Sequence, residues 1–159
     1  MDGPRYDGQW EEDRRQGEGT EVWPDGAKYV GQYLSGNMHG TGVFSWTDGA
    51  GYKGQFLENE SHGHGVHTWP DGREYYGEWQ KNRMHGTGVY TWADGRVYDG
   101  DYSSDQKHGV GAFTWADGRK YEGKWVQGKQ HGTGTYTTRE SKSRKGIWET
   151  GKRLRWIDV

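Results

Sequence analysis

A period of 23 residues constrains this chain more than any other feature of its sequence. Tyrosines open six consecutive segments at that spacing, without insertion or deletion: Tyr6, Tyr29, Tyr52, Tyr75, Tyr98 and Tyr121. A fixed period between about 20 and 50 residues is typical of repeat arrays, in which one small unit is stacked along an axis. The period therefore predicts tandem repeats instead of one globular core.

The period also sets the expected domain organisation. Residues 1–5 form a lead-in, and residues 144–159 form a partial repeat and a C-terminal cap. The six repeats between them span 6–28, 29–51, 52–74, 75–97, 98–120 and 121–143. Positions within a repeat are counted below from its opening Tyr.

Glycines and rings recur at fixed positions of the repeat. Positions 3, 12 and 14 are always Gly, position 5 is always aromatic, and position 18 is Trp in five of the six copies. At positions 1 to 5 rings and Gly alternate with mostly polar residues, which is the period-two pattern of a β-strand. A second strand is expected over positions 12 to 18, with positions 14, 16 and 18 on one face.

Two connections complete each predicted hairpin. Positions 6 to 10 vary freely and predict a solvated loop between the two strands. Asp-Gly at positions 20 and 21, as in Asp94-Gly95, is a strong turn signal that leads into the next copy. We expect an all-β fold, an elongated and twisted single-layer antiparallel sheet of tandem β-hairpins.

The composition agrees with a thin sheet and excludes several classes of protein. Leu occurs only three times, whereas there are 10 Trp, 11 Tyr and 29 Gly. The absence of Cys excludes disulfides and thiolate metal sites, and it fits a reducing compartment. No apolar run approaches 18 residues, so we expect a cytoplasmic protein without a membrane-spanning segment.

The charge is uneven although the net charge is only −2. Residues 139–155 contain seven Lys or Arg and two Asp or Glu, which gives +5 there and −7 elsewhere. A basic end on an acidic body can contact anionic lipid or an acidic partner, but a solvated cap is the simpler interpretation. We expect no nucleic-acid partner.

The last copy is degenerate. Thr138 replaces the Trp of position 18, and Arg144 stands where a seventh Tyr would open the next segment. A charged, imperfect terminal unit is typical of a capping strand. We expect Trp156 and Ile157 to fold back over rings that would otherwise be exposed.

The repeat resembles the MORN (membrane occupation and recognition nexus) repeat. The resemblance rests on Tyr-x-Gly-x-Trp at residues 75–79 and His-Gly-x-Gly-x-Tyr at residues 85–90, and it covers residues 6 to about 148. The first copy departs from the pattern, with Gln16 and Glu21 where His and an aromatic residue are usual. The resemblance implies scaffolds at cytoskeletal, ciliary or membrane-contact assemblies, some of which bind phosphoinositides, dimerise or capture a helical segment of a partner.

Catalysis and metal binding have little support in the sequence. Five histidines at position 11 could form a metal-binding or pH-sensitive ladder, but a structural role copied with the repeat is the favoured interpretation. His62, His64 and His67 resemble a ligand cluster, yet His67 is expected on the opposite face from the other two. Asp-Gly turns need no calcium. We expect no enzyme activity, no cofactor and no metal.

The aromatic face is the feature left to explain, because a single sheet has no second layer to cover it. Tyr at position 1 and Trp at position 18 barely vary and are assigned to stacking between repeats. Positions 5 and 16 vary, and two interpretations remain open: contact with a partner, or a second part of the core. The candidate partner-binding residues are Tyr33, Phe44, Phe56, His67, Trp79, Tyr90, Tyr102, Phe113, Trp125 and Tyr136.

The main hypothesis is a non-enzymatic scaffold or adaptor that binds an amphipathic helix or an extended peptide in an aromatic groove, for example from a cytoskeletal or motor protein. The alternative is a peripheral module for phosphoinositide or other anionic lipid. Its candidate residues are Lys142, Arg144, Lys145, Lys152, Arg153 and Arg155. Carbohydrate or choline capture ranks last. Open end strands also make a homodimer an expectation.

Overall fold

The computed structural model describes residues 2–157, and these residues form β-strands and turns without a helix. The fold is therefore all-β, as predicted. The fourteen strands are β1 (Arg5–Glu11), β2 (Arg14–Val22), β3 (Lys28–Leu34), β4 (Asn37–Ser45), β5 (Gly51–Leu57), β6 (Glu60–Thr68), β7 (Glu74–Gln80), β8 (Arg83–Thr91), β9 (Val97–Ser103), β10 (Gln106–Thr114), β11 (Lys120–Val126), β12 (Lys129–Thr137), β13 (Ser143–Glu149) and β14 (Lys152–Trp156).

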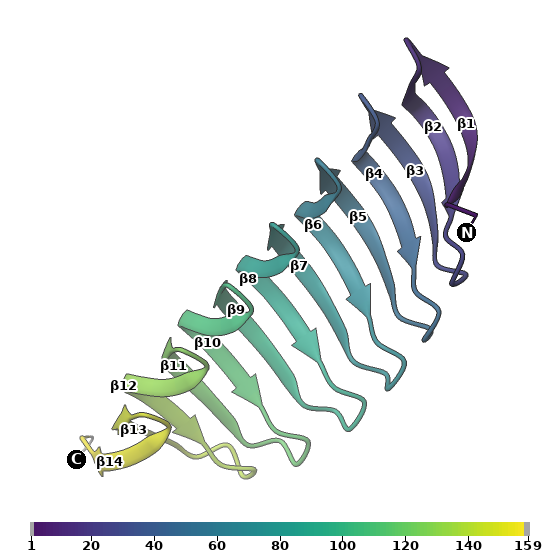
Figure 1. The fold of residues 1–159 in the computed structure, drawn as a ribbon. Coiled ribbons are helices and arrows are strands. Elements are labelled where there is room, and N and C mark those ends of the chain that lie inside the picture. Colours follow the sequence, from purple (N-terminus) through teal and green to yellow (C-terminus); the bar gives the residue numbers. More distant parts are fainter. Residues whose placement is uncertain (1, 158–159) are drawn as a thin grey trace. The chain divides into compact units, whose positions relative to one another are not determined.

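The strands divide between two compact units, one ending at Arg83 and the other beginning at Met84. In the first unit β1 to β7 follow one another in chain order, and each pairs antiparallel with its sequence neighbours. In the second unit the same holds from β8 to β14 (Figure 1). Each unit is an open sheet one layer thick.

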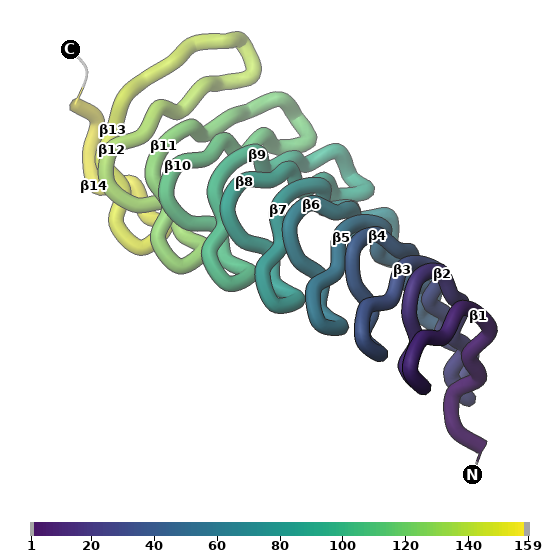
Figure 2. Tube along the Cα trace, turned by 90° about the horizontal axis from the view of Figure 1, so that it is seen from above, coloured from purple at the N-terminus to yellow at the C-terminus, as the bar shows by residue number. Residues whose placement is uncertain are grey.

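Glycine allows the hairpins to bend, and Figure 2 shows them curled rather than flat. In the second repeat Gly31 lies opposite Gly42 across β3 and β4. The Tyr29 ring folds over both glycines, and its hydroxyl donates to the Gln32 carbonyl at 2.8 Å. A Cβ on Gly31 would lie 2.5 Å from the Gly42 Cα, so the two backbones approach more closely there than any other residue allows.

A β-bulge shifts the pairing within the hairpins β1–β2, β3–β4, β5–β6, β9–β10 and β11–β12. In β3 and β4 the pairing passes from Gly31–Gly42 to Tyr33–Met38. The side-chain carbonyl of Gln32 accepts from the Thr41 N–H at 2.9 Å and so satisfies a backbone group of the bulge. Because residues that pair directly share a face, the bulge places position 10 opposite position 5, on the face that carries the rings.

The loop at positions 6 to 10 is shorter than predicted. Only positions 7 and 8 form the turn, usually with positive φ at both residues, as in Glu58 (φ 48°) and Asn59 (φ 71°). The remaining loop residues extend the two strands instead. Each turn is also bonded to the preceding repeat, as Asn59 shows: its side chain accepts from the Met38 N–H in β4 at 2.8 Å, and its own N–H donates to the Met38 carbonyl at 3.0 Å.

The Asp-Gly turns lie where the sequence predicted them. The Trp46 N–H donates to the Ala50 carbonyl at 2.9 Å, and the Asp48 carboxylate accepts from the Ala50 N–H at 2.9 Å. The C-terminal segment adds β13 and β14 as a final hairpin. Trp156 packs near Trp148 and Tyr136, with ring centroids 6.1 and 6.3 Å apart. Ile157, by contrast, donates its N–H to the Lys145 carbonyl at 3.0 Å and so lies with Lys145 on the face away from the rings, and the prediction that it covers the rings is wrong.

Candidate functional site

The rings gather on one face of each sheet, which we call the aromatic face: positions 1, 5, 10, 16 and 18. Position 1 forms its floor. The side chains of Tyr29, Tyr75, Tyr98 and Tyr121 are fully buried. Burial raises the pKa of Tyr121 to about 12 and raises the pKa of Tyr29 further, although each hydroxyl is bonded to a backbone carbonyl. These tyrosines are structural, as the sequence predicted.

Position 5 is also buried in the second to sixth repeats, which corrects the expectation that these rings stand uncovered, whereas Trp10 of the first repeat is 60% exposed. Four of these rings pack edge-to-face between the Tyr of their own repeat and the Tyr of the repeat before: Tyr33, Phe56, Trp79 and Trp125. Phe56, for example, lies 5.1 Å from both Tyr52 and Tyr29. Two of the indoles are further fixed by hydrogen bonds, Trp79 to the Gly65 carbonyl and Trp125 to the Gly111 carbonyl. The buried rings at this position are Tyr33, Phe56, Trp79, Tyr102 and Trp125.

Position 16 lies between the tryptophans of successive repeats. Phe44 is 5.2 Å from Trp23 and 4.6 Å from Trp46, measured between ring centroids. Tyr90 and Phe113 are buried, whereas Phe44, His67 and Tyr136 are only half-buried. The candidate residues at this position therefore differ in how much of the side chain is exposed to a partner. Their contact with a partner stays a prediction.

Position 18 provides partly exposed rings along the face. Trp46 is 40% exposed. In the third to fifth repeats an Arg at position 22 stacks on this Trp, as Arg73 does on Trp69 with its guanidinium carbon 4.9 Å from the ring centroid. The same Arg pairs with the Asp of the turn at 2.7 Å, which holds the pKa of Asp71 below its ordinary value.

Position 10 is the part of the face that sequence reasoning missed. It was assigned to a solvated loop, but the bulge turns it toward the rings. Met38 and Met84 were the available signal, since two apolar side chains are unusual in a solvated loop. The residues at this position are Arg15, Met38, Ser61, Met84, Lys107 and Gln130.

Positions 10 and 16 interact in the first repeat. Arg15 and Glu21 form an ion pair at 2.6 Å, and the Tyr33 hydroxyl donates to the same carboxylate at 2.9 Å. Glu21 is only 5% exposed. Burial, together with this carboxylate, raises the pKa of Tyr33. The acidic residue that departs from the family pattern is thus balanced by a basic residue at position 10.

Lys107 places an ammonium group among four rings. Its Nζ lies 5.6 Å from the ring centroids of Trp92, Phe113 and Trp125 and 5.5 Å from that of Tyr98. Burial, and secondarily the charge of Arg96, lowers the pKa of Lys107. The negative faces of the rings oppose this loss of charge.

The basic residues proposed for lipid are exposed, but strand pairing divides them between two faces. Arg144 lies opposite Tyr136 and Arg153 opposite Trp148, which puts both on the aromatic face. The other face carries Lys145, Arg155 and Lys152. They lie opposite Thr135, Ile147 and Glu149, respectively. Lys142 lies in the turn before β13. They do not form one flat basic surface.

Residues 2–157 offer no clustered set of metal ligands and no membrane-spanning helix. No group of three or more His, Asp or Glu is placed there to hold a metal ion. His62 and His64 are exposed, whereas His67 is half-buried against Trp46 and Trp69 and burial lowers its pKa. That part of the chain also contains no helix long and apolar enough to cross a membrane.

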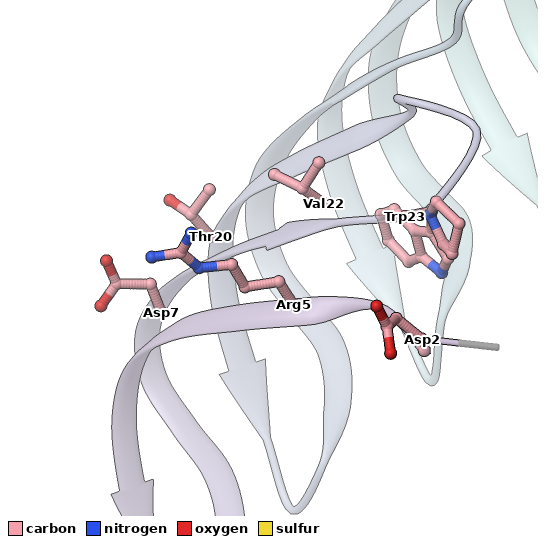
Figure 3. A pocket seen from close by; sticks show the side chains of 8 residues that line it. Asp2, Arg5, Asp7, Thr20, Val22 and Trp23 are labelled. Atoms are coloured by element: carbon pink, nitrogen blue, oxygen red, sulfur yellow. The ribbon is translucent and has the colours of Figure 1, made fainter.

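A separate cavity of about 500 Å³ lies at the N-terminal edge of the first unit. Figure 3 shows Asp2 and Trp23 on one side of it and Asp7 and Thr20 on the other. Arg5 and Asp7 lie opposite Val22 and Thr20 in β2, on the face that the rings do not occupy. This cavity is therefore lined mostly from the face opposite the rings, with Trp23 of the aromatic face at its border.

Fold and face together define a β-hairpin repeat protein in which each unit is a single-layered sheet with rings on one side. A family model of the MORN repeat matches residues 6–28, 29–51, 52–72, 75–95, 98–118 and 121–139. The chain belongs to the MORN-repeat family, as its sequence indicated. MORN repeats are generally scaffolds that bind proteins or membranes, and the family is generally non-enzymatic.

Comparison with curated proteins gave no match. Among solved structures, the chain is similar to the TCP10 domain of Danio rerio CPAP, with 13% identity, 89% of this chain and 73% of that chain covered, and a TM-score of 0.35. It is also similar to an inactive virginiamycin B lyase from Staphylococcus aureus crystallised with quinupristin, with 12% identity, 91% and 46% covered, and a TM-score of 0.19. Likenesses this distant carry no argument about function.

Proposed function

We propose that this protein is a non-enzymatic scaffold that binds a helical or extended segment of a partner protein on its aromatic face. One observation carries the proposal. Within residues 2–157 neither a helix nor a second sheet lies over that face, yet rings at positions 16 and 18 stay partly exposed along it. Surfaces of this kind are typical of binding sites.

The buried rings at position 5 form the base of the proposed groove. Their role is to hold the rim rings at positions 16 and 18 in place, and position 10 supplies the chemistry between them. A partner in this groove makes its main contacts with half-exposed groups such as Phe44, Trp46 and His67. Its own anchors are apolar side chains, because the rim offers mainly the faces and edges of rings.

The repeat geometry predicts the spacing of those anchors. Two strands at about 4.8 Å each separate equivalent positions by about 10 Å within a unit. A helix rises about 1.5 Å per residue, so one anchor every six or seven residues matches one anchor per repeat. An extended peptide matches the same distance with about three residues.

The test replaces Trp46 of the full chain with a photo-cross-linking amino acid, and the variant is added to extract of its source cells. Val43 is the matched control, because it is also 40% exposed and lies on the opposite face of β4. We expect the cross-linker at residue 46 to mark one peptide segment whose apolar anchors have the spacing given above. The same cross-linker at residue 43 should not mark that segment. A synthetic copy of the segment is then titrated by calorimetry.

Two variants make the test quantitative. Trp46→Ala should weaken binding of the synthetic segment at least about tenfold, whereas Val43→Ala should leave it unchanged. Both variants should keep the far-UV spectrum of the wild type. Equal binding by folded Trp46→Ala and wild type, or equal cross-linking from both faces, contradicts the proposal.

A second candidate, binding to anionic lipid, is supported by the exposure of the C-terminal basic residues together with Leu154, which is 59% exposed. Their division between two faces makes it the weaker candidate. Sedimentation with phosphoinositide vesicles at two salt concentrations tests it, because a charge-driven contact fades as salt rises.

Pairing of edge strands into a homodimer stays a prediction, which sedimentation velocity tests.

A further inference from the structure

Two successive repeats of the second unit contain the same frame of four rings with different contents. The first frame, the filled box, consists of Trp92, Tyr98, Phe113 and Trp125, from positions 18, 1, 16 and 5 of three consecutive segments. Its centre is occupied by the Lys107 ammonium, about equally distant from all four rings. The chain therefore shows directly which group such a frame accepts.

The second frame, the open box, lies one repeat further on. Its rings are Trp115, Tyr121, Tyr136 and Trp148, and Gln130 replaces the lysine at position 10. A cavity of about 290 Å³ remains there, lined by Trp115, Gln130, Tyr136, Trp148, Arg153 and Trp156. Trp156 adds a further ring to the wall, 6.1 Å from Trp148 and 6.3 Å from Tyr136.

We infer that the open box binds an alkylammonium group, supplied either by a methylated lysine side chain or by a free quaternary ammonium compound. The faces of several rings directed at one point attract a cation through their quadrupoles, and Trp gives the strongest attraction. The cavity volume is close to the lower end of small-molecule sites, about 300 Å³, which suits a group of this size. The inference does not depend on the proposed partner segment.

The arginines around the open box repel a cation that enters it. The filled box holds an ammonium group despite a similar repulsion. Arg153 and Arg144 lie over Trp156 at 4.3 and 4.4 Å, and Arg119 lies over Trp115 at 5.3 Å. In the filled box Arg96 lies over Trp92 at 4.9 Å, and the Lys107 ammonium is still held there. A quaternary ammonium suits the open box better than a primary one, because it cannot lose its charge by giving up a proton.

The experiment follows the indole N–H signals of the full-length chain by NMR during titration with choline. The control ligand is 3,3-dimethylbutan-1-ol, which has the same shape as choline but carries no charge. We expect saturable shifts of Trp115, Trp148 and Trp156 with choline, and binding of the alcohol at least about tenfold weaker. Equal binding of the two compounds shows a merely apolar cavity and overturns the inference, as does the absence of a saturable shift.

Matched substitutions exchange the contents of the two boxes. Gln130→Lys should fill the open box with the chain's own ammonium and reduce choline binding at least about tenfold. Lys107→Gln should create a second choline site, reported by Trp92 and Trp125. Arg153→Gln should tighten binding, because it removes a like charge. Looser binding in that variant shows that contacts of the Arg153 side chain outweigh its like charge, and it overturns the inference.

Two further ligands distinguish the sources of the ammonium group. Trimethyllysine amide and lysine amide carry the same chain and differ only in methylation. Tighter binding of trimethyllysine amide than of choline indicates a modified protein side chain, and the reverse order indicates a free compound. The wild-type comparison of choline with its neutral analogue needs no variant to fold, so it decides the inference by itself.

Discussion

Two glycines that face each other across one hairpin should respond differently to the same added methyl group. A Cβ on Gly42 would meet the Tyr29 ring, with Cε2 and Cζ each 2.5 Å away. A Cβ on Gly31 would meet mainly backbone, the Gly42 Cα at 2.5 Å and the Thr41 carbonyl oxygen at 2.6 Å, with the Tyr29 hydroxyl at 2.7 Å as its third neighbour. A side chain can be shortened by mutation, whereas the neighbouring backbone cannot.

The magnitude follows from the depth of these overlaps. Ordinary carbon contacts lie at about 3.5–4.0 Å, so each new methyl group must displace its neighbour by about 1 Å. Overpacking of this kind costs about 1–3 kcal/mol. Moving Tyr29 also weakens its hydrogen bond to the Gln32 carbonyl, which is worth about 1 kcal/mol. We expect Gly42→Ala and Gly31→Ala each to destabilise β3 and β4 by about 3 kcal/mol.

Rescue by a shorter side chain separates the two mechanisms. Tyr29→Leu removes the ring atoms that crowd Gly42, so Gly42→Ala should cost less than about 1 kcal/mol in that background. Gly31→Ala should still cost about 3 kcal/mol there. Gly51→Ala is the control, because a Cβ at that residue meets only ordinary contacts at 3.5 and 3.6 Å.

Native-state hydrogen exchange of the β3 and β4 amides is the appropriate assay. It measures the local free energy of opening without requiring the whole chain to unfold in one step. If Tyr29→Leu rescued both alanine variants equally, or neither, the close approach of the two backbones would not be what requires glycine here.

Two other predictions concern charged and titratable groups of the aromatic face. Burial holds the pKa of His67 below 6.5 despite the opposing charge of Asp48, with Arg73 lowering it further, so the unfolded chain takes up the proton first as pH falls. Wild type should therefore lose more stability than His67→Phe between pH 7 and pH 5 in urea denaturation, and parallel curves would contradict this. Glu21→Gln should cost about 2 kcal/mol, because it leaves Arg15 without its carboxylate partner. The double variant Arg15→Met with Glu21→Phe, which copies Met38 and Phe44 of the next repeat, should be at least as stable as wild type, and a loss as large as that of the single variant would refute this interpretation.

Much of the fold could be predicted because the chain repeats the same pattern of glycines and rings every 23 residues. Gly at positions 3 and 14 and rings at positions 1 and 16 pair directly in the structure, as Gly31 does with Gly42 and Tyr29 with Phe44. Alternation alone put these residues on one face. The turn after position 18 was equally predictable, because Asp48 caps it with a hydrogen bond that Asp commonly makes in turns.

The parts that could not be predicted depend on contacts between strands. Position 10 faces the rings only because a bulge shifts the pairing, and the bulge depends on a position-4 side chain such as Gln32 bonding to the Thr41 N–H. Position 5 is buried only because the sheet bends and brings the Tyr of the preceding repeat against it, as Tyr29 lies against Phe56. Neither the bend nor the bulge is encoded in the hydrophobic pattern of one strand.

These two corrections change where specificity should be sought. Positions 1 and 18 hardly vary and position 5 is buried in the second to sixth repeats, so the repeats differ in the chemistry of the aromatic face mainly at positions 10 and 16. The pairs at these positions run from Arg15 with Glu21, through Met38 with Phe44 and Ser61 with His67, to Lys107 with Phe113 and Gln130 with Tyr136. Within each unit one frame therefore presents a different pair of side chains about every 10 Å. A ligand that reads two neighbouring repeats is then fixed in register by the order of these pairs, which identical rings alone could not achieve.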